Sequence, residues 1–263
     1  MKNVVVVGCG RSGTSLVTGS IMGSGRYWAG AETDHWDVDA FNPKGYYEDT
    51  SLVHLNERLL STCAESPLIT LGRSHPDTRK APIQEYWLGL LEEGVEPLVD
   101  SALRSQMEGY LARCPTGRPF CLKDPQFSYT LSTWLPFFSN VAFVAVFRDP
   151  LSTADSLVRM TSRLDHLKPL GIDRDYAVEL WTCMNRRIVE QLASQRDGLF
   201  LHARQVFEAA GRERLEAHLG GAIDREFGEA RLMSPPQSTA GLPAATRDLY
   251  AQLCELAGFS VDV

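Results

Sequence analysis

The chain has 263 residues, 44% of them hydrophobic, and a formal net charge of −7 at pH 7. This length and composition allow a large buried core, and no linker divides the chain, so we expect a single domain over residues 1–263. The acidic balance argues against a broad nucleic-acid-binding surface, although a local basic pocket for a small anion is compatible with it.

The sequence also bears on location and on metal binding. Its apolar runs are all shorter than a membrane span, and the first strand starts too close to Met1 for a secretory signal. The six cysteines form neither a Cys-x-x-Cys pair nor a ligand-like spacing with histidine. We therefore expect a soluble cytoplasmic protein with reduced thiols and no metal site.

The first segment combines a strand, a glycine-rich loop and the start of a helix. Residues 4–7 are four consecutive valines, which is typical of a parallel strand buried on both faces. Glycines at positions 8, 10 and 13 follow, and a helix is expected over residues 15–22. Glycines let the loop amides approach an anion, and the helix N-terminus adds the positive end of its dipole. An oxyanion is the expected ligand.

This loop differs from that of an ATP-binding protein. It keeps the Gly-x4-Gly spacing, but Thr14 follows Gly13 where a lysine should reach the outer phosphates. A cation, Arg11, lies inside the loop instead. This pattern favours a different phosphate or sulfate ligand, and a tight turn without a ligand is the alternative.

The next part of the chain is predicted to contain helices separated by loops. Three features are expected first: a return toward the sheet at residues 26–30, a helix capped by Asp49 or Thr50, and a surface loop at residues 73–82. Apolar positions at helical spacing over residues 83–113 then predict two helices that face the sheet, with a break near Gly94 and Pro97.

Two further predicted strands end directly in cations. Residues 120–122 lead into Lys123, and the strongly apolar run at residues 141–147 leads into Arg148. Because parallel strands end at the same edge of a sheet, we expect Arg11, Lys123 and Arg148 to lie on one rim. Three cations surrounded by glycine amides would bind a ligand with more than one anionic group.

The rest of the chain continues the alternation of strands and helices. Helices are expected near residues 127–138, 151–163, 173–195, 205–219 and 246–257, with a strand at 199–202 and a loop at 234–239. This alternation predicts an α/β fold with a central, mostly parallel sheet flanked by helices.

Three blocks resemble the P-loop-like sulfotransferases that use 3′-phosphoadenosine 5′-phosphosulfate (PAPS), most closely the tyrosylprotein sulfotransferases and related bacterial enzymes. The blocks are Gly10-Arg11-Ser12-Gly13-Thr14-Ser15, Lys123-Asp124-Pro125, and Phe147-Arg148-Asp149-Pro150 with Ser156. The resemblance implies a three-layer P-loop-like fold. It also implies that residues 10–15 bind the 5′-phosphosulfate, that Arg148 and Ser156 bind the 3′-phosphate, and that Lys123 faces the transferred sulfuryl group.

The same comparison suggests a catalytic base. The tyrosylprotein enzymes carry a Glu-Thr pair at the spacing from the loop arginine that Glu32 has from Arg11. The resemblance then implies that Arg11 and Lys123 stabilise charge on the sulfuryl and leaving oxygens without a metal, with adenosine 3′,5′-bisphosphate (PAP) as the product. Glu48 and Asp124 are alternative bases, each of which could instead be a helix cap or a salt-bridge partner.

The acceptor and two other functions stay open at this point. A hydroxyl of a small molecule, a glycan or a tyrosyl group would fit, and Trp36, Tyr46, Tyr47 and Trp87 are candidates for an acceptor pocket or for the core. His35 lies three residues after Glu32, and a lone histidine of this kind is more typical of a partly exposed side chain than of a site residue. The alternatives to transfer from PAPS are a small-molecule kinase or nucleotide hydrolase that uses ATP and magnesium, and a non-catalytic nucleotide-binding module.

Overall fold

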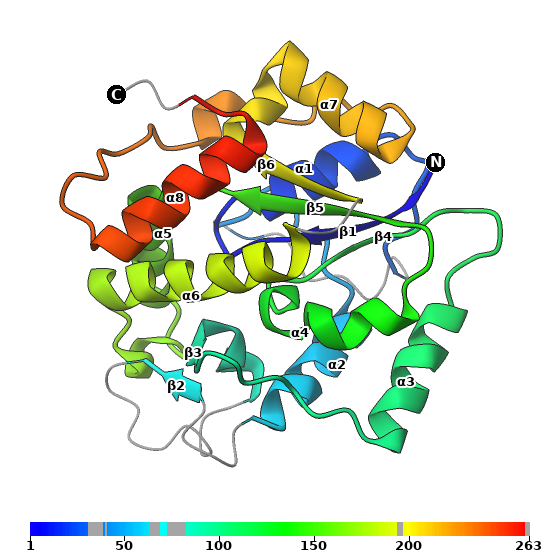
Figure 1. Cartoon of the computed structure of the whole chain (residues 1–263), viewed down its shortest axis with the longest axis horizontal. Helices are drawn as coiled ribbons and strands as arrows, with labels where there is room; N and C mark the ends of the chain where they lie inside the picture. Colours follow the sequence, from blue (N-terminus) through cyan, green and yellow to red (C-terminus); the bar gives the residue numbers. More distant parts are fainter. Residues whose placement is uncertain (31–38, 40, 64–68, 73–82, 194–196, 261–263) are drawn as a thin grey trace.

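The computed structural model is an α/β fold whose central sheet is covered by helices on both faces (Figure 1). It describes residues 1–30, 39, 41–63, 69–72, 83–193 and 197–260. In this part of the chain the main sheet has four parallel strands in the order β4-β1-β5-β6. The strands are β1 (Asn3–Val7), β4 (Cys121–Lys123), β5 (Val141–Phe147) and β6 (Gly198–His202). The predicted α/β class and mostly parallel sheet are confirmed.

The register of the strands brings the predicted motifs to one edge. Val6 in β1 pairs with Lys123 in β4 on one side and with Val144 in β5 on the other. The three strands run in the same direction, so the loop after β1, the turn after β4 and the turn after β5 all leave the sheet at its carboxyl edge.

The four valines of β1 divide the core into two layers. Val5 and Val7 belong to a cluster with helices α4 (Phe127–Trp134) and α6 (Arg174–Leu192). Val4 and Val6 belong to a cluster with α1 (Thr14–Met22) and α7 (Ala209–Leu219) on the opposite face. This alternation is the period of two that a strand imposes on its side chains. The result is the predicted arrangement of helix, sheet and helix layers.

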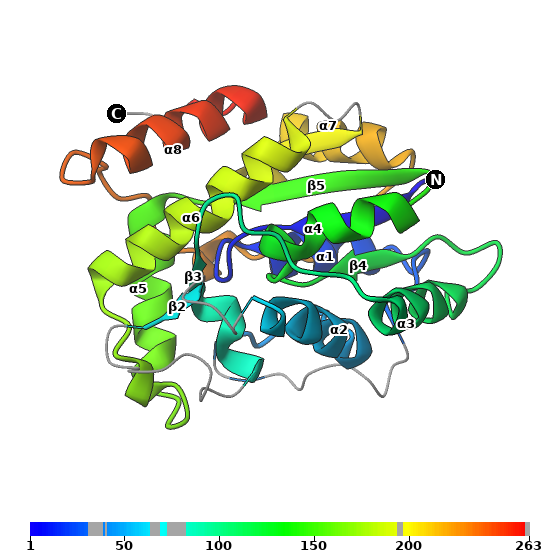
Figure 2. The ribbon, with the colours of Figure 1, turned by 60° about the horizontal axis from the view of Figure 1, so that its bottom comes forward.

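The remaining helices extend the first of these layers. They are α2 (Thr50–Ser61), α3 (Ser101–Ala112), α5 (Pro150–Thr161) and α8 (Ala244–Ala257). Helix α6 packs against both α5 and α8, and α2 packs against α3. Figure 2 shows α2 and α3 together at the end of the molecule opposite to α8. Short 3₁₀ turns are Ile83–Leu88, Leu135–Phe137, Lys168–Leu170, Ala203–Phe207 and Ala230–Leu232.

The prediction of two helices over residues 83–113 is wrong in its first half. The 3₁₀ turn Ile83–Leu88 leads into strand β3 (Gly89–Leu91), which pairs antiparallel with β2 (Ile69–Leu71), a strand that was not predicted. A short apolar run fits either a buried helix or a buried strand. Here a distant residue favours the strand, because the Tyr176 hydroxyl in α6 bonds to the Thr70 and Leu88 carbonyls. The second predicted helix is α3.

Most other elements match their predictions within a few residues. The return of the chain toward the sheet is a single parallel bridge between Trp28 and Phe120. The predicted loop at residues 73–82 lies outside the described residues. Among the described helices, none combines the length and apolar character that crossing a bilayer requires. All six cysteines are free thiols.

Candidate active site

The carboxyl edge of the sheet opens into a cavity of about 830 Å³. Residues of all three predicted blocks line it: Gly10, Arg11, Gly13, Thr14, Ser15, Lys123, Asp124, Pro125, Arg148 and Ser156. Ser12 is fully buried. The predicted base, Glu32, lies outside the described residues, as do His35 and Trp36. The structure thus brings together three segments that are far apart in sequence.

The loop after β1 is shaped to expose its amides. Arg11 and Gly13 both have positive φ angles, 68° and 94°. Glycine adopts this conformation freely, whereas arginine adopts it at a cost that often marks a functional loop. Gly10 has a second role, because a Cβ atom placed there would lie 2.5 Å from the Trp87 ring. Only glycine allows that ring to pack against the loop.

The helix that follows the loop lacks the aspartate cap that α2, α3, α5 and α6 have. Asp49, Asp100, Asp149 and Asp173 accept hydrogen bonds from the first-turn amides of α2, α3, α5 and α6. Gly13, at the N-cap of α1, offers no side chain for this purpose. The first amides of α1 therefore suit an external anion, which the helix dipole also attracts.

Lys123 connects the loop to the segment before α2. Its side chain is 2% exposed and donates hydrogen bonds to Ser15 Oγ and to the Tyr46 carbonyl, each at 3.1 Å. It also forms an ion pair with Glu48. Because the ammonium group is buried and tied to the first turn of α1, it is in position to neutralise negative charge that develops beside the loop.

Arg11 connects the loop to α5. Its Nε atom donates to Ser156 Oγ at 3.2 Å, and one of its terminal nitrogens donates to the Phe41 carbonyl at 2.7 Å. Ser156 lies in the second turn of α5, and the turn after β5 holds Arg148. Arg11 and Ser156, which are predicted to contact opposite ends of one ligand, are therefore joined directly by a hydrogen bond.

Arg148 is one of several cations crowded into this part of the cavity. Burial lowers its pKa, and repulsion from Arg204, Arg11 and Arg159 lowers that pKa further, against the opposing effect of Asp149. Burial likewise lowers the pKa of Arg11. Arg148 and Arg204 both donate to the Ser234 carbonyl, at 3.2 Å and 3.0 Å. Mutual repulsion of this kind is relieved by an anion.

The two alternative bases differ in how their oxygens are used. Asp124 is 2% exposed, and its two oxygens accept from the Asn56 side chain at 2.8 Å and the Gln126 amide at 2.9 Å. Burial raises the pKa of Asp124 to about 7. The bond from Asn56 joins α2 to the turn after β4, so Asp124 has a structural role here. Glu48 lines the cavity too, but it contacts Lys123.

The aromatic candidates also separate. Tyr46 and Trp87 line the cavity. The Tyr46 hydroxyl donates to Asp39 at 2.7 Å, and this hydrogen bond together with burial raises the pKa of Tyr46. Tyr47 packs edge-on against Phe227 and is absent from the described lining of the cavity. Of the predicted aromatic candidates that the structure describes, Tyr46 and Trp87 are therefore the two in position to contact an acceptor.

Several lining residues were not anticipated from the sequence. They include an apolar group and two buried carboxylates: Val53, Glu57, Glu85, Met160, Leu164 and Leu167. Glu57 is 4% exposed, and burial raises its pKa from the ordinary value of 4.5 to about 7. The available signal was a charged residue four positions after Val53, on the same face of an amphipathic helix.

Replacing Glu57 with glutamine is expected to stabilise the protein at alkaline pH. The folded-state pKa is raised, so the wild type loses stability as pH rises from the unfolded value toward about 7. Between about pH 5.5 and about pH 8, E57Q should gain roughly 2 kcal/mol over the wild type in free energy of unfolding. Glu85 and His166 line the same cavity and are unchanged in the variant, so the comparison of the two proteins isolates Glu57.

Urea denaturation of both proteins at the two pH values measures this difference. A wild type that gains stability over E57Q as pH rises would instead show that Glu57 has a cationic partner in the folded chain.

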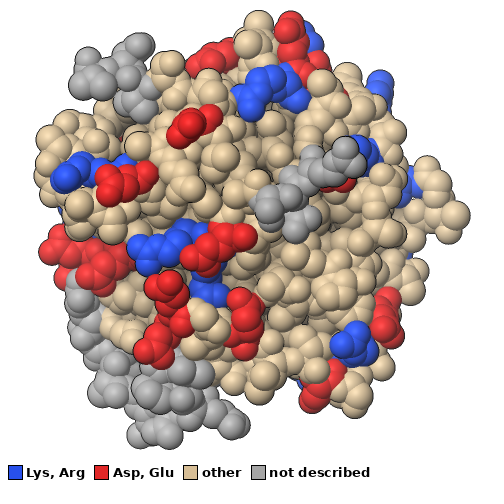
Figure 3. All heavy atoms as spheres, in the orientation of Figure 1, with Lys and Arg blue, Asp and Glu red and all other residues tan. Residues whose placement is uncertain are grey.

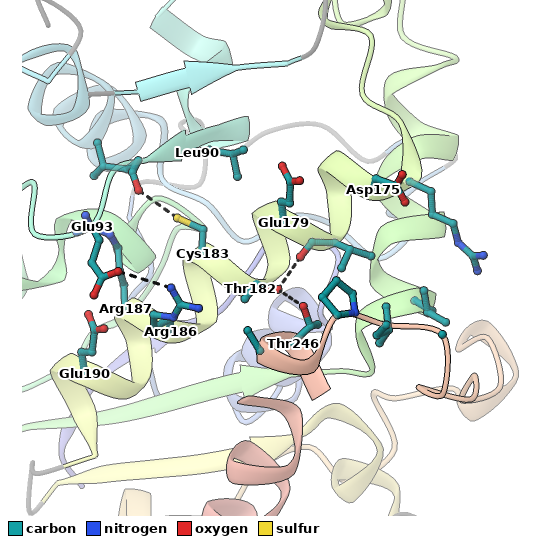
Figure 4. Close-up of a pocket in the computed structure, with 18 of the residues that line it drawn as sticks. Leu90, Glu93, Asp175, Glu179, Thr182, Cys183, Arg186, Arg187, Glu190 and Thr246 are labelled. Carbon is teal, nitrogen blue, oxygen red and sulfur yellow. Dashed lines mark hydrogen bonds and ion pairs between the residues drawn. The ribbon is translucent and has the colours of Figure 1, made fainter. Parts of the chain in front are cut away.

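A second cavity, of about 1040 Å³, lies along α6 and the start of α8 (Figure 4). Several of its polar side chains already have partners: the Cys183 thiol bonds to the Leu91 carbonyl, Thr182 to Thr246, and Arg186 pairs with Glu93. On the same face of the molecule, acidic and basic side chains lie intermingled (Figure 3). None of the predicted motif residues lines this cavity, so we place the chemistry in the first one.

Comparison with known proteins identifies the family of the chain. Residues 3–210 match the family model described as the sulfotransferase family. No curated protein matches the chain in sequence. Among solved structures, the sulfotransferase domain from the curacin biosynthetic pathway aligns with a TM-score of 0.55 and 16% identity, covering 99% of this chain and 98% of that one.

Two further solved structures have the same fold. The sulfotransferase domain of the Synechococcus PCC 7002 olefin synthase aligns with a TM-score of 0.52 and 17% identity, and the Alicyclobacillus acidocaldarius sulfotransferase with 0.53 and 12%. Each alignment covers 99% of this chain and 97% of the other. At these identities the likeness concerns the P-loop-like fold alone, but the family match covers most of the sequence. The chain belongs to the sulfotransferase family.

Proposed function

We propose that this protein, acting as a single domain, transfers a sulfuryl group from PAPS to a hydroxyl of an acceptor. The observation that carries the proposal is the hydrogen bond of 3.2 Å between Arg11 Nε and Ser156 Oγ. It joins the loop after β1 to α5 in a cavity that also contains Lys123 and Arg148. Such a cavity suits a ligand with anionic groups at two ends, as PAPS has.

In this proposal the two ends of the donor bind to different elements. The amides of residues 10–15 and the N-terminus of α1 hold the 5′-phosphosulfate. Arg148 and Ser156 hold the 3′-phosphate, and Arg159, one turn after Ser156 in the same cavity, adds a further positive charge. The buried Arg148 Nε supports this role: among the described residues it has no hydrogen-bond acceptor, and the Asp149 carboxylate is 3.8 Å away.

The reaction itself needs alignment and charge stabilisation more than covalent catalysis. The acceptor oxygen forms a bond to sulfur while the bond from sulfur to the 5′-phosphate oxygen breaks, and PAP leaves. A carboxylate accepts the proton of the acceptor hydroxyl. Lys123 neutralises charge on the sulfuryl and leaving oxygens, and Arg11 assists from between the two phosphate sites.

We propose Glu32 as the base, and the family resemblance of the Glu32-Thr33 pair supports this choice. E32Q is expected to lower kcat by about 10²–10⁴-fold without weakening PAP binding, because only proton removal is lost. E48Q should have a smaller effect, since it removes the partner of Lys123 and not the base. Steady-state kinetics and calorimetric titration with PAP measure the two quantities.

The exposed Glu108 in α3 offers a matched control, E108Q, which should behave as wild type. Full turnover by E32Q together with a large loss in E48Q would transfer the role of base to Glu48, the described carboxylate that contacts Lys123.

The donor can be tested apart from the acceptor. Thermal unfolding with PAP, compared with ATP plus magnesium, distinguishes a sulfotransferase from a kinase or nucleotide hydrolase built on a similar loop. Because binding to the folded state raises its stability by mass action, PAP should raise Tm. Stabilisation by ATP and magnesium alone would refute transfer from PAPS.

A further inference from the structure

One wall of the active-site cavity contains a buried carboxylate. Glu57, in the second turn of α2, lines the cavity and is 4% exposed. Among the described residues no side chain or amide donates to it, and no cation pairs with it. Arg163 and His166 line the cavity as well, but among the described residues no hydrogen bond or ion pair joins either of them to Glu57. An isolated buried carboxylate is costly, and proteins retain such groups chiefly where a ligand uses them.

Two side chains from the 3₁₀ turn Ile83–Leu88, Glu85 and Trp87, also line this wall. Glu85 comes from the 3₁₀ turn that packs against α2, is 5% exposed and lines the same cavity. Trp87 comes from the same turn, and its ring packs against Gly10 in the phosphate loop. The wall therefore combines the Glu57 carboxylate with an aromatic face and begins directly beside the loop.

The cavity also contains cationic side chains. Arg11 donates to Ser156 Oγ, and repulsion from Arg11 and Arg159 lowers the pKa of Arg148. Arginines thus gather where we place the donor, whereas Glu57 lines the cavity from α2. An apolar group, Val53, Met160 and Leu164, lines it too. This arrangement would repel an acidic acceptor and attract a basic one.

We propose that the acceptor carries a cationic group, an ammonium or guanidinium, that binds to Glu57 and lies against Trp87 while the hydroxyl reaches Lys123. The inference rests on the proposed function and specifies its substrate class as a hydroxyl compound with a basic nitrogen. Ion pairing with a buried carboxylate and contact with an aromatic face are the two interactions that select such a cation.

The test compares two phenols that differ in one group. Tyramine and 4-propylphenol are nearly the same size, and only tyramine carries an ammonium group. In calorimetric titrations of the PAP-loaded protein, we expect tyramine to bind about 10-fold or more tightly than 4-propylphenol, as a charged hydrogen bond allows. In E57Q this ratio should fall to about one, while E108Q should keep the wild-type ratio.

Two outcomes would overturn the inference. One is a ratio near one in the wild type, or an unchanged ratio in E57Q. The other is that neither tyramine nor n-hexylammonium, a cation without the phenol, binds at millimolar concentration. The same titrations without PAP separate this inference from the proposed function, because a protein that does not bind PAP can still bind the cation at Glu57.

Discussion

Replacing Lys123 with methionine is expected to lower kcat by about 10²–10³-fold, because one buried charge that stabilises the transferred group is removed. Methionine keeps the length and much of the volume of the lysine stem, so PAP affinity should change far less than kcat. Steady-state transfer assays and calorimetric titration with PAP give the two values. A variant with wild-type kcat would show that Lys123 only holds the segment at Tyr46 and Glu48 in place.

The controls for this variant come from the ion pair and from the surface. Methionine at position 123 leaves Glu48 without its cation, which destabilises a poorly exposed carboxylate. The double variant K123M/E48Q removes both charges and should recover stability without recovering activity. K168M removes an exposed lysine that pairs with Asp165, and it should have wild-type activity.

Replacing Arg148 with alanine is expected to weaken PAP binding by about 10–100-fold, the value of a charged hydrogen bond to phosphate. Adenosine 5′-monophosphate lacks the 3′-phosphate, so its affinity should change little. S156A should act in the same direction with a smaller effect, because a neutral hydroxyl contributes less than a guanidinium. Competition titrations with both nucleotides measure the discrimination.

Comparing the two nucleotides separates recognition from folding. Arg148 also donates to the Ser234 carbonyl, so its loss could loosen the segment between α7 and α8. That change would weaken both nucleotides alike, and equal losses would contradict a specific role at the 3′-phosphate. R174A removes an exposed arginine that pairs with Asp155 and should leave both affinities at wild-type values.

The elements that the sequence predicted well are those whose residues determine their structure locally. The valines of β1 and the apolar run of β5 are too long and too β-branched for a turn, and Asp49 caps α2 as expected. Strands β2 and β3 could not be predicted in the same way. They depend on the hydroxyl of Tyr176, about a hundred residues away in the sequence.

In the candidate site, too, some positions follow from the local sequence and others depend on how distant elements pack. Arg11, Lys123 and Arg148 could be placed on one rim because each follows a parallel strand, and the structure has them in one cavity. Glu57 could not be placed there, because its position depends on how α2 packs against the 3₁₀ turn that carries Trp87. The bond between Arg11 and Ser156 depends likewise on the direction of α5. Glu32 stays a prediction outside the described residues.

The most direct test of the proposed function is transfer of radiolabelled sulfate from PAPS to a set of hydroxyl acceptors that includes tyramine, 4-propylphenol, a simple sugar and a tyrosine peptide. We predict a labelled ester on at least one acceptor, formed together with PAP, and abolished in K123M. A protein that binds PAP but labels none of the acceptors and releases no PAP would contradict the assignment of this cavity as the site of sulfuryl transfer.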